Sequence, residues 1–358
     1  MLGELENLLK AAKESRRQEP EGATFDFVKN SDGGLNRYGL FPLPSSQINF
    51  TSKANHSAEN SEEKRVENAD GVAPRGTVIF IPGRTEFIEK FYEDIHMFHA
   101  LGFSCAAFDL RGQGLSHREN PDRDKHYVET FDNHLSDLRQ LFEEILKGEN
   151  AVNLPEPYIL MGHSAGSHVI LRFLSEHQGY AAKAITVAPM VRVASGGAPN
   201  FILYGLPKLM ISLGRGSGYI PGHTKFKTGR WGWRKKLTHD DARFEDEDYF
   251  IHNKDADLAV GGATFKWLHE ALNSIDKLNA PTVPEAIDVP VLMLQAGEDQ
   301  IVDNAAQTAL AKRVPEIGLV RIEGAMHELL KETDDKRLLV WQSILPFLGL
   351  ELSKNPDP

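Results

Sequence analysis

A serine stands between two glycines where an apolar strand pattern runs into a helical pattern. The run 158–161 leads into Gly162-His163-Ser164-Ala165-Gly166. A serine at the tip of such a turn adopts a sparsely populated backbone conformation, and glycines two residues before and after it leave the space that this turn needs. The turn raises the Ser164 hydroxyl clear of the sheet, so this residue is our candidate nucleophile.

A serine hydroxyl attacks a carbonyl efficiently only if a base removes its proton, and an acid must hold the tautomer of that base. After a serine in this context, the acid is expected first and the histidine second. Asp299 follows a predicted strand and is our candidate acid, with Glu298 and Asp303 as alternatives. His327 follows the last predicted strand and is our candidate base.

Two backbone N–H groups must stabilise the oxyanion that forms when the serine attacks, and each contributes roughly 3 kcal/mol. Ala165, at the start of the predicted helix, supplies one. Arg84, in the loop after the predicted strand 77–81, supplies the other. The Arg84 side chain either binds an anionic headgroup or pairs with Glu86.

Strands and helices alternate on both sides of the serine motif. This alternation predicts an α/β fold, a mostly parallel central sheet with helices on both faces. Ligands then bind at the carboxyl ends of the strands. The predicted parallel strands are 77–81, 104–108, the run from 158, 184–188, 291–296 and 319–322.

The alternation stops for roughly a hundred residues, which indicates an inserted, mainly helical cap over the strand ends. Its apolar side chains suit an acyl chain, although packing between cap and core explains any one of them equally well. The expected segments are an amphipathic N-terminal segment 1–23, a first core part 24–190 with a polar loop at about 44–74, the cap 191–289, a second core part 290–350 and a tail 351–358. The candidate substrate-binding residues are Arg84, Glu86, Phe201, Tyr204, Met210, Trp231 and Trp267.

Composition excludes several classes of function. The net charge of -11 over 358 residues argues against nucleic acid as the main partner. The single cysteine, Cys105, excludes an internal disulfide and a thiolate metal cluster. No apolar run is long enough to span a bilayer, and the N-terminus lacks a signal peptide. We therefore expect a cytoplasmic protein without a cofactor or metal; peripheral membrane contact and the oligomeric state stay open.

The ordered motifs resemble the α/β-hydrolase superfamily, and within it the bacterial lysophospholipase and monoacylglycerol lipase-like branch, which is grouped with serine aminopeptidases. The resemblance implies an α/β-hydrolase fold, with Ser164, Asp299 and His327 as catalytic triad and the amides of Arg84 and Ala165 as oxyanion hole. Two departures are Pro82-Gly83, where many relatives have His-Gly, and Gly166-Ser167 in place of Gly-Gly. The resemblance rests on 82–87, 109–116, 162–166, 188–190, 237–240, 264–268 and 297–299.

We expect a serine hydrolase that cleaves the carboxylic ester of a monoacyl lipid, a lysophospholipid or monoacylglycerol, through an acyl-enzyme. One alternative is a serine peptidase of the same fold that releases an N-terminal residue. That activity needs an acidic pocket, for which Glu86, Asp240, Asp241 and Glu245 are candidates. The other alternative is a non-catalytic, ligand-binding member of the superfamily.

Overall fold

The structure is a computed structural model, and it describes residues 2–44, 74–148, 154–194, 196–197, 199–229 and 231–351. The side chains of residues 200 and 231–233 are also outside the description. The predicted polar loop and the tail therefore lie almost wholly outside the described residues.

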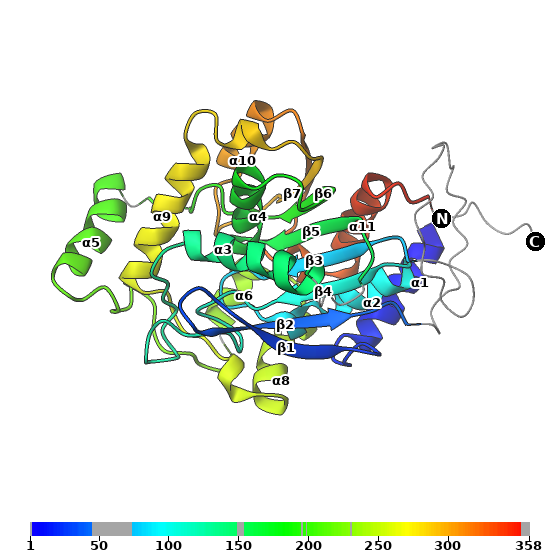
Figure 1. Ribbon diagram of the computed structural model, residues 1–358, viewed down its shortest axis with the longest axis horizontal. Coiled ribbons are helices and arrows are strands. Elements are labelled where there is room, and N and C mark those ends of the chain that lie inside the picture. The colour runs from blue at the N-terminus through cyan, green and yellow to red at the C-terminus, as the bar shows by residue number, and fades with distance from the viewer. Residues whose placement is uncertain are drawn as a thin grey trace, which may run out of the picture.

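A sheet of eight strands forms the centre of the described chain (Figure 1). The strand order is β1-β2-β4-β3-β5-β6-β7-β8. The hairpin β1–β2 pairs internally and with β4 in antiparallel fashion, and every other pairing is parallel. The strands are β1 (Thr24–Lys29), β2 (Leu35–Phe41), β3 (Thr77–Ile81), β4 (Ser104–Phe108), β5 (Tyr158–His163), β6 (Lys183–Val187), β7 (Val291–Ala296) and β8 (Ile317–Ile322).

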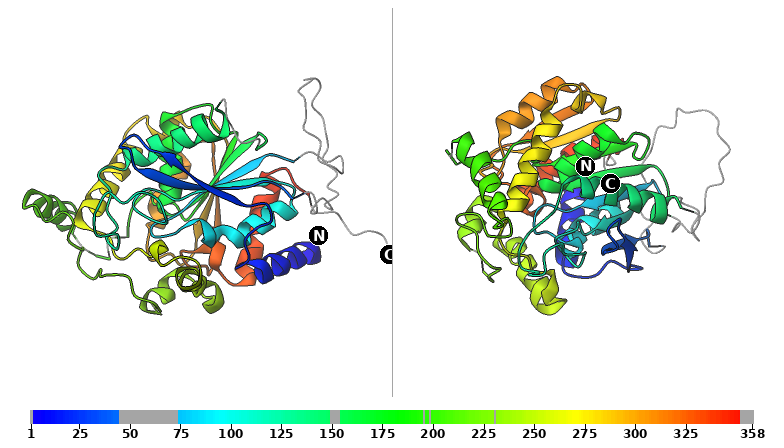
Figure 2. Two further views of the ribbon diagram at one scale, coloured as in Figure 1. Left: turned by 60° about the horizontal axis from the view of Figure 1, so that its bottom comes forward. Right: turned by 60° about the vertical axis from the view of Figure 1, so that its left-hand side comes forward.

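Helices cover both faces of the sheet, as Figure 2 shows. Alternate strand residues point to opposite faces, so Phe80 belongs to the apolar cluster that includes side chains of α1, α2 and α11, whereas Ile79 belongs to the cluster that includes side chains of α3, α4 and α10. The predicted α/β architecture is confirmed. The helices that cover the two faces of the sheet are α1 (Leu2–Ser15), α2 (Tyr92–Ala100) after the short turn η2 (Ile88–Phe91), α3 (Asp132–Gln140), which continues as the π-helix η3 (Leu141–Leu146), α4 (Ala165–Glu176), α10 (Asn304–Arg313) and α11 (Asp334–Phe347).

The regular elements of the described part of 191–289 are helices, which we call the cap. Helix α9 packs against α4 of the core and against α5, and α5 lies outermost in Figure 1. The cap helices are α5 (Asn200–Ser212), α6 (Trp231–Leu237), α7 (Asp241–Phe244), α8 (Asp246–Asn253), η4 (Ala256–Leu258), α9 (Phe265–Asn279) and η5 (Pro284–Ala286); a further short turn, η6 (Leu329–Lys331), precedes α11.

The N-terminal helix α1 buries one apolar side against the core. Leu5 and Leu9 are buried and pack with the α2 and α11 side chains. The periodicity of leucines in this segment therefore corresponds to a docked helix. Among the described residues, no helix has both the length and the apolar character that crossing a membrane requires.

Candidate active site

Ser164 sits in the sharp turn between β5 and α4, with φ 51° and ψ -111°. Backbone hydrogen bonds fix this strained conformation from both sides. The Ser164 N–H donates to Val187 O at 2.8 Å, and the Ser164 carbonyl accepts from Met190 N at 3.1 Å. Because these partners lie at the end of β6, the neighbouring strand holds the serine in place.

The two glycines of the motif are required by close backbone approach. A Cβ on Gly166 would overlap the carbonyl oxygens of Ile81 and Pro82, so no side chain fits between α4 and β3. A Cβ on Gly162 would meet Ile170 Cδ1 at 2.7 Å. Ser167 stands where the family pattern has the second glycine of a Gly-Gly pair. Its hydroxyl donates a hydrogen bond to Gly162 O at 2.5 Å and so ties α4 to β5.

The structure brings Ser164, His327 and Asp299 together. His327 Nε2 lies 2.9 Å from Ser164 Oγ, and His327 Nδ1 lies 2.7 Å from Asp299 Oδ2. Asp299 Oδ1 accepts hydrogen bonds from the N–H groups of Ile301 and Val302 at 2.8 and 3.0 Å. Burial raises the pKa of Asp299, but the His327 imidazole and these hydrogen bonds outweigh it, so its pKa lies below the usual range.

The two alternative acids have other positions. The side chain of Asp303 accepts hydrogen bonds from Ala305 N and Ala306 N and so caps α10. Glu298 donates its N–H to Ala325 O, which ties the Asp299 loop to the turn before His327. Asp299 is thus the carboxylate that contacts the imidazole.

The loop that carries the Arg84 amide is held by a glutamine that sequence analysis missed. Gln113 donates from Nε2 to Gly83 O at 2.7 Å and to Glu86 O at 2.8 Å. Its Oε1 accepts from Thr85 N at 3.3 Å, and Thr85 has a φ of 67°. The other expected donor, Ala165, is the first residue of α4, where a helix leaves its N–H groups without intrahelical acceptors.

Glu86 is buried and faces His163 and Lys90. Its Oε2 accepts the Gly83 N–H at 2.6 Å and lies 3.1 Å from His163 Nδ1, and its Oε1 lies 3.3 Å from Lys90 Nζ. The groups that contact this carboxylate are thus a backbone N–H, an imidazole and an ammonium group. Burial alone raises the pKa of Glu86, yet His163 and Lys90 hold it far below its usual value.

The predicted substrate-binding residues fall into two groups. Trp267 is 6% exposed, and it shares an apolar cluster with Ala165 and Met190; the Arg84 guanidinium carbon lies 5.9 Å from the centre of its ring. The α5 residues lie on the outer helix instead. Phe201 is 77% exposed, Met210 is half-buried, and the Tyr204 hydroxyl donates to Asp276 at 2.9 Å. Trp231 opens α6, and its side chain lies outside the described residues.

Asp109 and Arg111 hold loops together. Asp109 accepts from Ile88 N at 2.9 Å and from Leu115 N at 3.0 Å, and Arg111 binds both oxygens of Asp137. Within the described residues, no group of three His, Cys, Asp or Glu side chains is arranged to hold a metal ion.

Comparison with known sequences finds a family model and several named relatives. The family model described as serine aminopeptidase, S33, matches residues 72–334. The probable lysophospholipase L2 of Haemophilus influenzae is 29% identical over 279 residues, which cover 78% of this chain and 85% of that protein. Lysophospholipase L2 of Escherichia coli K12 is 28% identical over 292 residues, covering 76% and 80%.

The chain also resembles solved structures. A soluble variant of monoglyceride lipase from Saccharomyces cerevisiae superposes with a TM-score of 0.64 at 19% identity, over 91% of this chain and 95% of that chain. The monoacylglycerol lipase of Paleococcus ferrophilus gives a TM-score of 0.59 at 20% identity, over 77% and 95%. At these identities the likeness shows a shared fold, and the predicted α/β-hydrolase fold is confirmed.

Proposed function

This chain belongs to the serine aminopeptidase (S33) family, and from that membership together with the site geometry we propose that it is a serine hydrolase that cleaves the carboxylic ester of a monoacyl lipid. The observation that carries the proposal is the alignment of Ser164 Oγ, the two nitrogens of His327 and Asp299 Oδ2 through contacts of 2.9 and 2.7 Å.

The reaction proceeds in two halves. Ser164 Oγ attacks the ester carbonyl carbon while His327 Nε2 takes its proton, and the carbon–oxygen bond to the alcohol then breaks as His327 returns that proton to the leaving oxygen. A water molecule attacks the acyl-enzyme in the same way and releases the carboxylic acid. Asp299 keeps the proton on Nδ1, so that Nε2 is free to accept. The Arg84 and Ala165 amides stabilise the oxyanion in both halves.

A monoacyl lipid is the substrate class that best fits the surroundings of the serine. Ala165, Met190 and Trp267 belong to one apolar cluster beside Ser164, and such surfaces suit an acyl chain. The relatives that are 28–29% identical carry the name lysophospholipase L2. A lysophospholipid is therefore our first choice and a monoacylglycerol our second.

The peptidase alternative lacks support from three of its four candidate carboxylates. Glu86 faces Lys90 and His163, Asp240 contacts the Arg243 guanidinium at 2.8 Å, and Asp241 forms an ion pair with Arg234. Because cations of the chain already neutralise these groups, they offer little attraction to the ammonium group of a peptide N-terminus.

We extend the proposal to contact between the cap and aggregated lipid. Helix α5 projects beyond α9 in Figure 1 and exposes several large apolar side chains. The exposed fractions are 77% for Phe201, 43% for Ile202 and 54% for Leu209, and Leu213, which directly follows α5, is 60% exposed. A surface of this kind suits the apolar region of a lipid aggregate.

The test is a substrate panel with Ser164→Ala as control. We expect fatty acid release from a lysophospholipid or a monoacylglycerol, and a loss on the order of 10³-fold or more in the variant. Hydrolysis of aminoacyl arylamides alone supports the peptidase instead. Failure of Ser164 to react with a fluorophosphonate supports the non-catalytic alternative, and undiminished ester turnover by Ser164→Ala overturns the proposed mechanism.

A further inference from the structure

A cap segment lies directly against the loop that carries His327. The segment Leu237–Asp240 joins α6 to α7, and it runs beside residues 326–333 of the core. Glu328 N donates to Leu237 O at 2.8 Å, and Thr238 Oγ1 donates to Lys331 O at 2.6 Å. The residue that follows the candidate base is therefore bonded to the cap.

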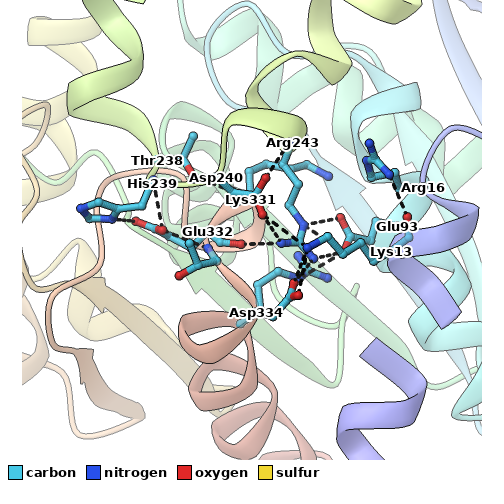
Figure 3. A network of polar contacts seen from close by, with 12 residues as sticks. Lys13, Arg16, Glu93, Thr238, His239, Asp240, Arg243, Lys331, Glu332 and Asp334 are labelled. Carbon is cyan, nitrogen blue, oxygen red and sulfur yellow. Dashed lines mark hydrogen bonds and ion pairs between the residues drawn. The ribbon is translucent and has the colours of Figure 1, made fainter. Parts of the chain in front are cut away.

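One buried carboxylate, that of Glu332, contacts both the cap segment and the loop before His327. Glu332 has a fully buried side chain, and Figure 3 shows it facing His239 of the cap. Its Oε1 accepts from Met326 N at 2.7 Å and from His239 Nδ1 at 2.9 Å. Its Oε2 accepts from His239 N at 3.2 Å and from Thr333 N at 3.1 Å. Met326 immediately precedes His327, so the same carboxylate holds the cap and the backbone of the candidate base.

The cap segment is fixed from its other end as well. Arg243 of α7 is buried, and it donates to Glu332 O at 2.8 Å and to Glu93 Oε1 of α2 at 2.7 Å (Figure 3). Its Nη1 also reaches Asp240 Oδ2 at 2.8 Å. Displacing the segment would break charged hydrogen bonds away from water, which is costly. The segment is thus held at Asp240 and Arg243 as well as at His239.

We propose that Glu332 is a positioning residue that sets the place of His327 by holding the Met326 N–H and the cap residue His239 on one carboxylate. The position of the cap segment on the core then determines the distance between His327 Nε2 and Ser164 Oγ, which is 2.9 Å here. A displacement of the base by about 1 Å lowers a reaction rate by on the order of 10²-fold. The inference deepens the proposed function and rests on it.

The first experiment compares Glu332→Gln with the wild type. Glutamine keeps the size of the side chain but turns an NH₂ group toward N–H donors, so at least one of the hydrogen bonds that the Glu332 carboxylate accepts is lost. We expect kcat for a short-chain ester and the rate of fluorophosphonate labelling of Ser164 to fall by about tenfold or more, with KM changed by less than about twofold. His239→Ala, from the cap side, lowers both rates in the same direction.

Asp137→Asn is the matched control. Asp137 is also a buried carboxylate with charged hydrogen bonds, but its partner is Arg111, and it does not contact the His327 loop. We expect wild-type labelling from this variant at temperatures well below its unfolding. Wild-type labelling by folded Glu332→Gln, or an equal loss in Asp137→Asn, overturns the inference.

Hydrogen–deuterium exchange of the full chain separates this inference from the proposed function. In Glu332→Gln, peptides covering 324–330 and 236–241 both exchange faster, whereas β5 does not. A change in one peptide alone, or in neither, refutes the coupling. A wild type that neither labels nor hydrolyses esters refutes the proposed function, and the exchange result still decides the coupling. If Glu332→Gln does not fold, Thr238→Val and His239→Ala give the same comparison.

Discussion

The imidazole of His163 and the carboxylate of Glu86 form a buried pair beside the candidate triad, with 3.1 Å between Nδ1 and Oε2. The other nitrogen of His163 lies 3.2 Å from the carbonyl oxygen of His327, and the two imidazole rings are 4.8 Å apart. Glu86 also accepts the Gly83 N–H. The pair therefore connects the loop of the Arg84 amide to the backbone of the candidate base.

Glu86→Gln is expected to lower stability in a way that depends on pH. The pKa of Glu86 is lowered in the folded protein, so its contribution to the free energy of unfolding is fully present above its ordinary pKa of about 4.3. This contribution is lost as pH falls through the pKa of the folded state. Burial lowers the pKa of His163, but Glu86 outweighs it and the net shift is upward. The contribution of His163 to the free energy of unfolding is thus fully present below about pH 6.5, and it is lost as pH rises through the raised pKa of the folded state.

The two contributions overlap between about pH 5 and 6.5, and there the difference in melting temperature between wild type and Glu86→Gln is largest. It shrinks toward about pH 9, where the Lys90 ammonium and the Gly83 N–H still favour the carboxylate. Thermal unfolding of both proteins across this range is the measurement. A difference that is constant with pH, or that grows toward pH 9, contradicts the assigned pair.

Asp299→Asn is expected to lower kcat by on the order of 10³–10⁴-fold. The amide can turn its NH₂ group toward His327 Nδ1, which places the proton of the imidazole on Nε2, where it cannot accept from Ser164. Asp303→Asn is the matched control, because that carboxylate caps α10 and does not contact the imidazole. Equal losses of kcat in the two variants would contradict the choice of Asp299 as the acid.

Sequence patterns predicted the elements that position the site because their causes are local. The runs 77–81, 104–108 and 291–296 are short, apolar and closed by Pro, Asp or Gly, and they are β3, β4 and β7 without a change of boundary. Ser164 and Asp299 each follow such a strand, so the topology alone brings them to the same edge of the sheet.

Other positions could not be predicted because they depend on tertiary contacts. Gln113 and Glu332 are single polar residues in loops, and which N–H or carbonyl they meet follows from the packing of distant segments. The contacts of Glu86 with the Gly83 N–H and with His163 likewise follow from the turn and from the packing of a neighbouring strand. Apolar composition did not distinguish Trp267, which faces the core, from Phe201, which faces outward.

Gly166→Ala and Gly205→Ala are expected to have opposite effects, although both replace a glycine within a helix. A methyl group on Gly166 would overlap two backbone carbonyls, which cannot move like a flexible side chain, so α4 must shift and carry Ser164 with it. Gly205 of α5 has nothing within 4 Å of the added Cβ, so alanine there stabilises by about 0.5–1 kcal/mol. Chemical denaturation and fluorophosphonate labelling measure both variants. Normal labelling by Gly166→Ala would contradict the close approach of α4 to β3.

Phe201→Asp combined with Leu209→Asp is expected to lower hydrolysis of substrate presented in vesicles without changing hydrolysis of a monomeric short-chain ester. Both side chains are exposed on α5 and do not belong to the apolar cluster beside Ser164, so charge there opposes lipid contact and leaves the chemistry intact. Leu339→Asp, at a position on α11 that is 43% exposed, is the control for added charge. Vesicle co-sedimentation and initial rates are measured on all three proteins. Equal vesicle binding by wild type and the double variant contradicts lipid contact through α5, and a loss of short-chain activity places these residues in the substrate site instead.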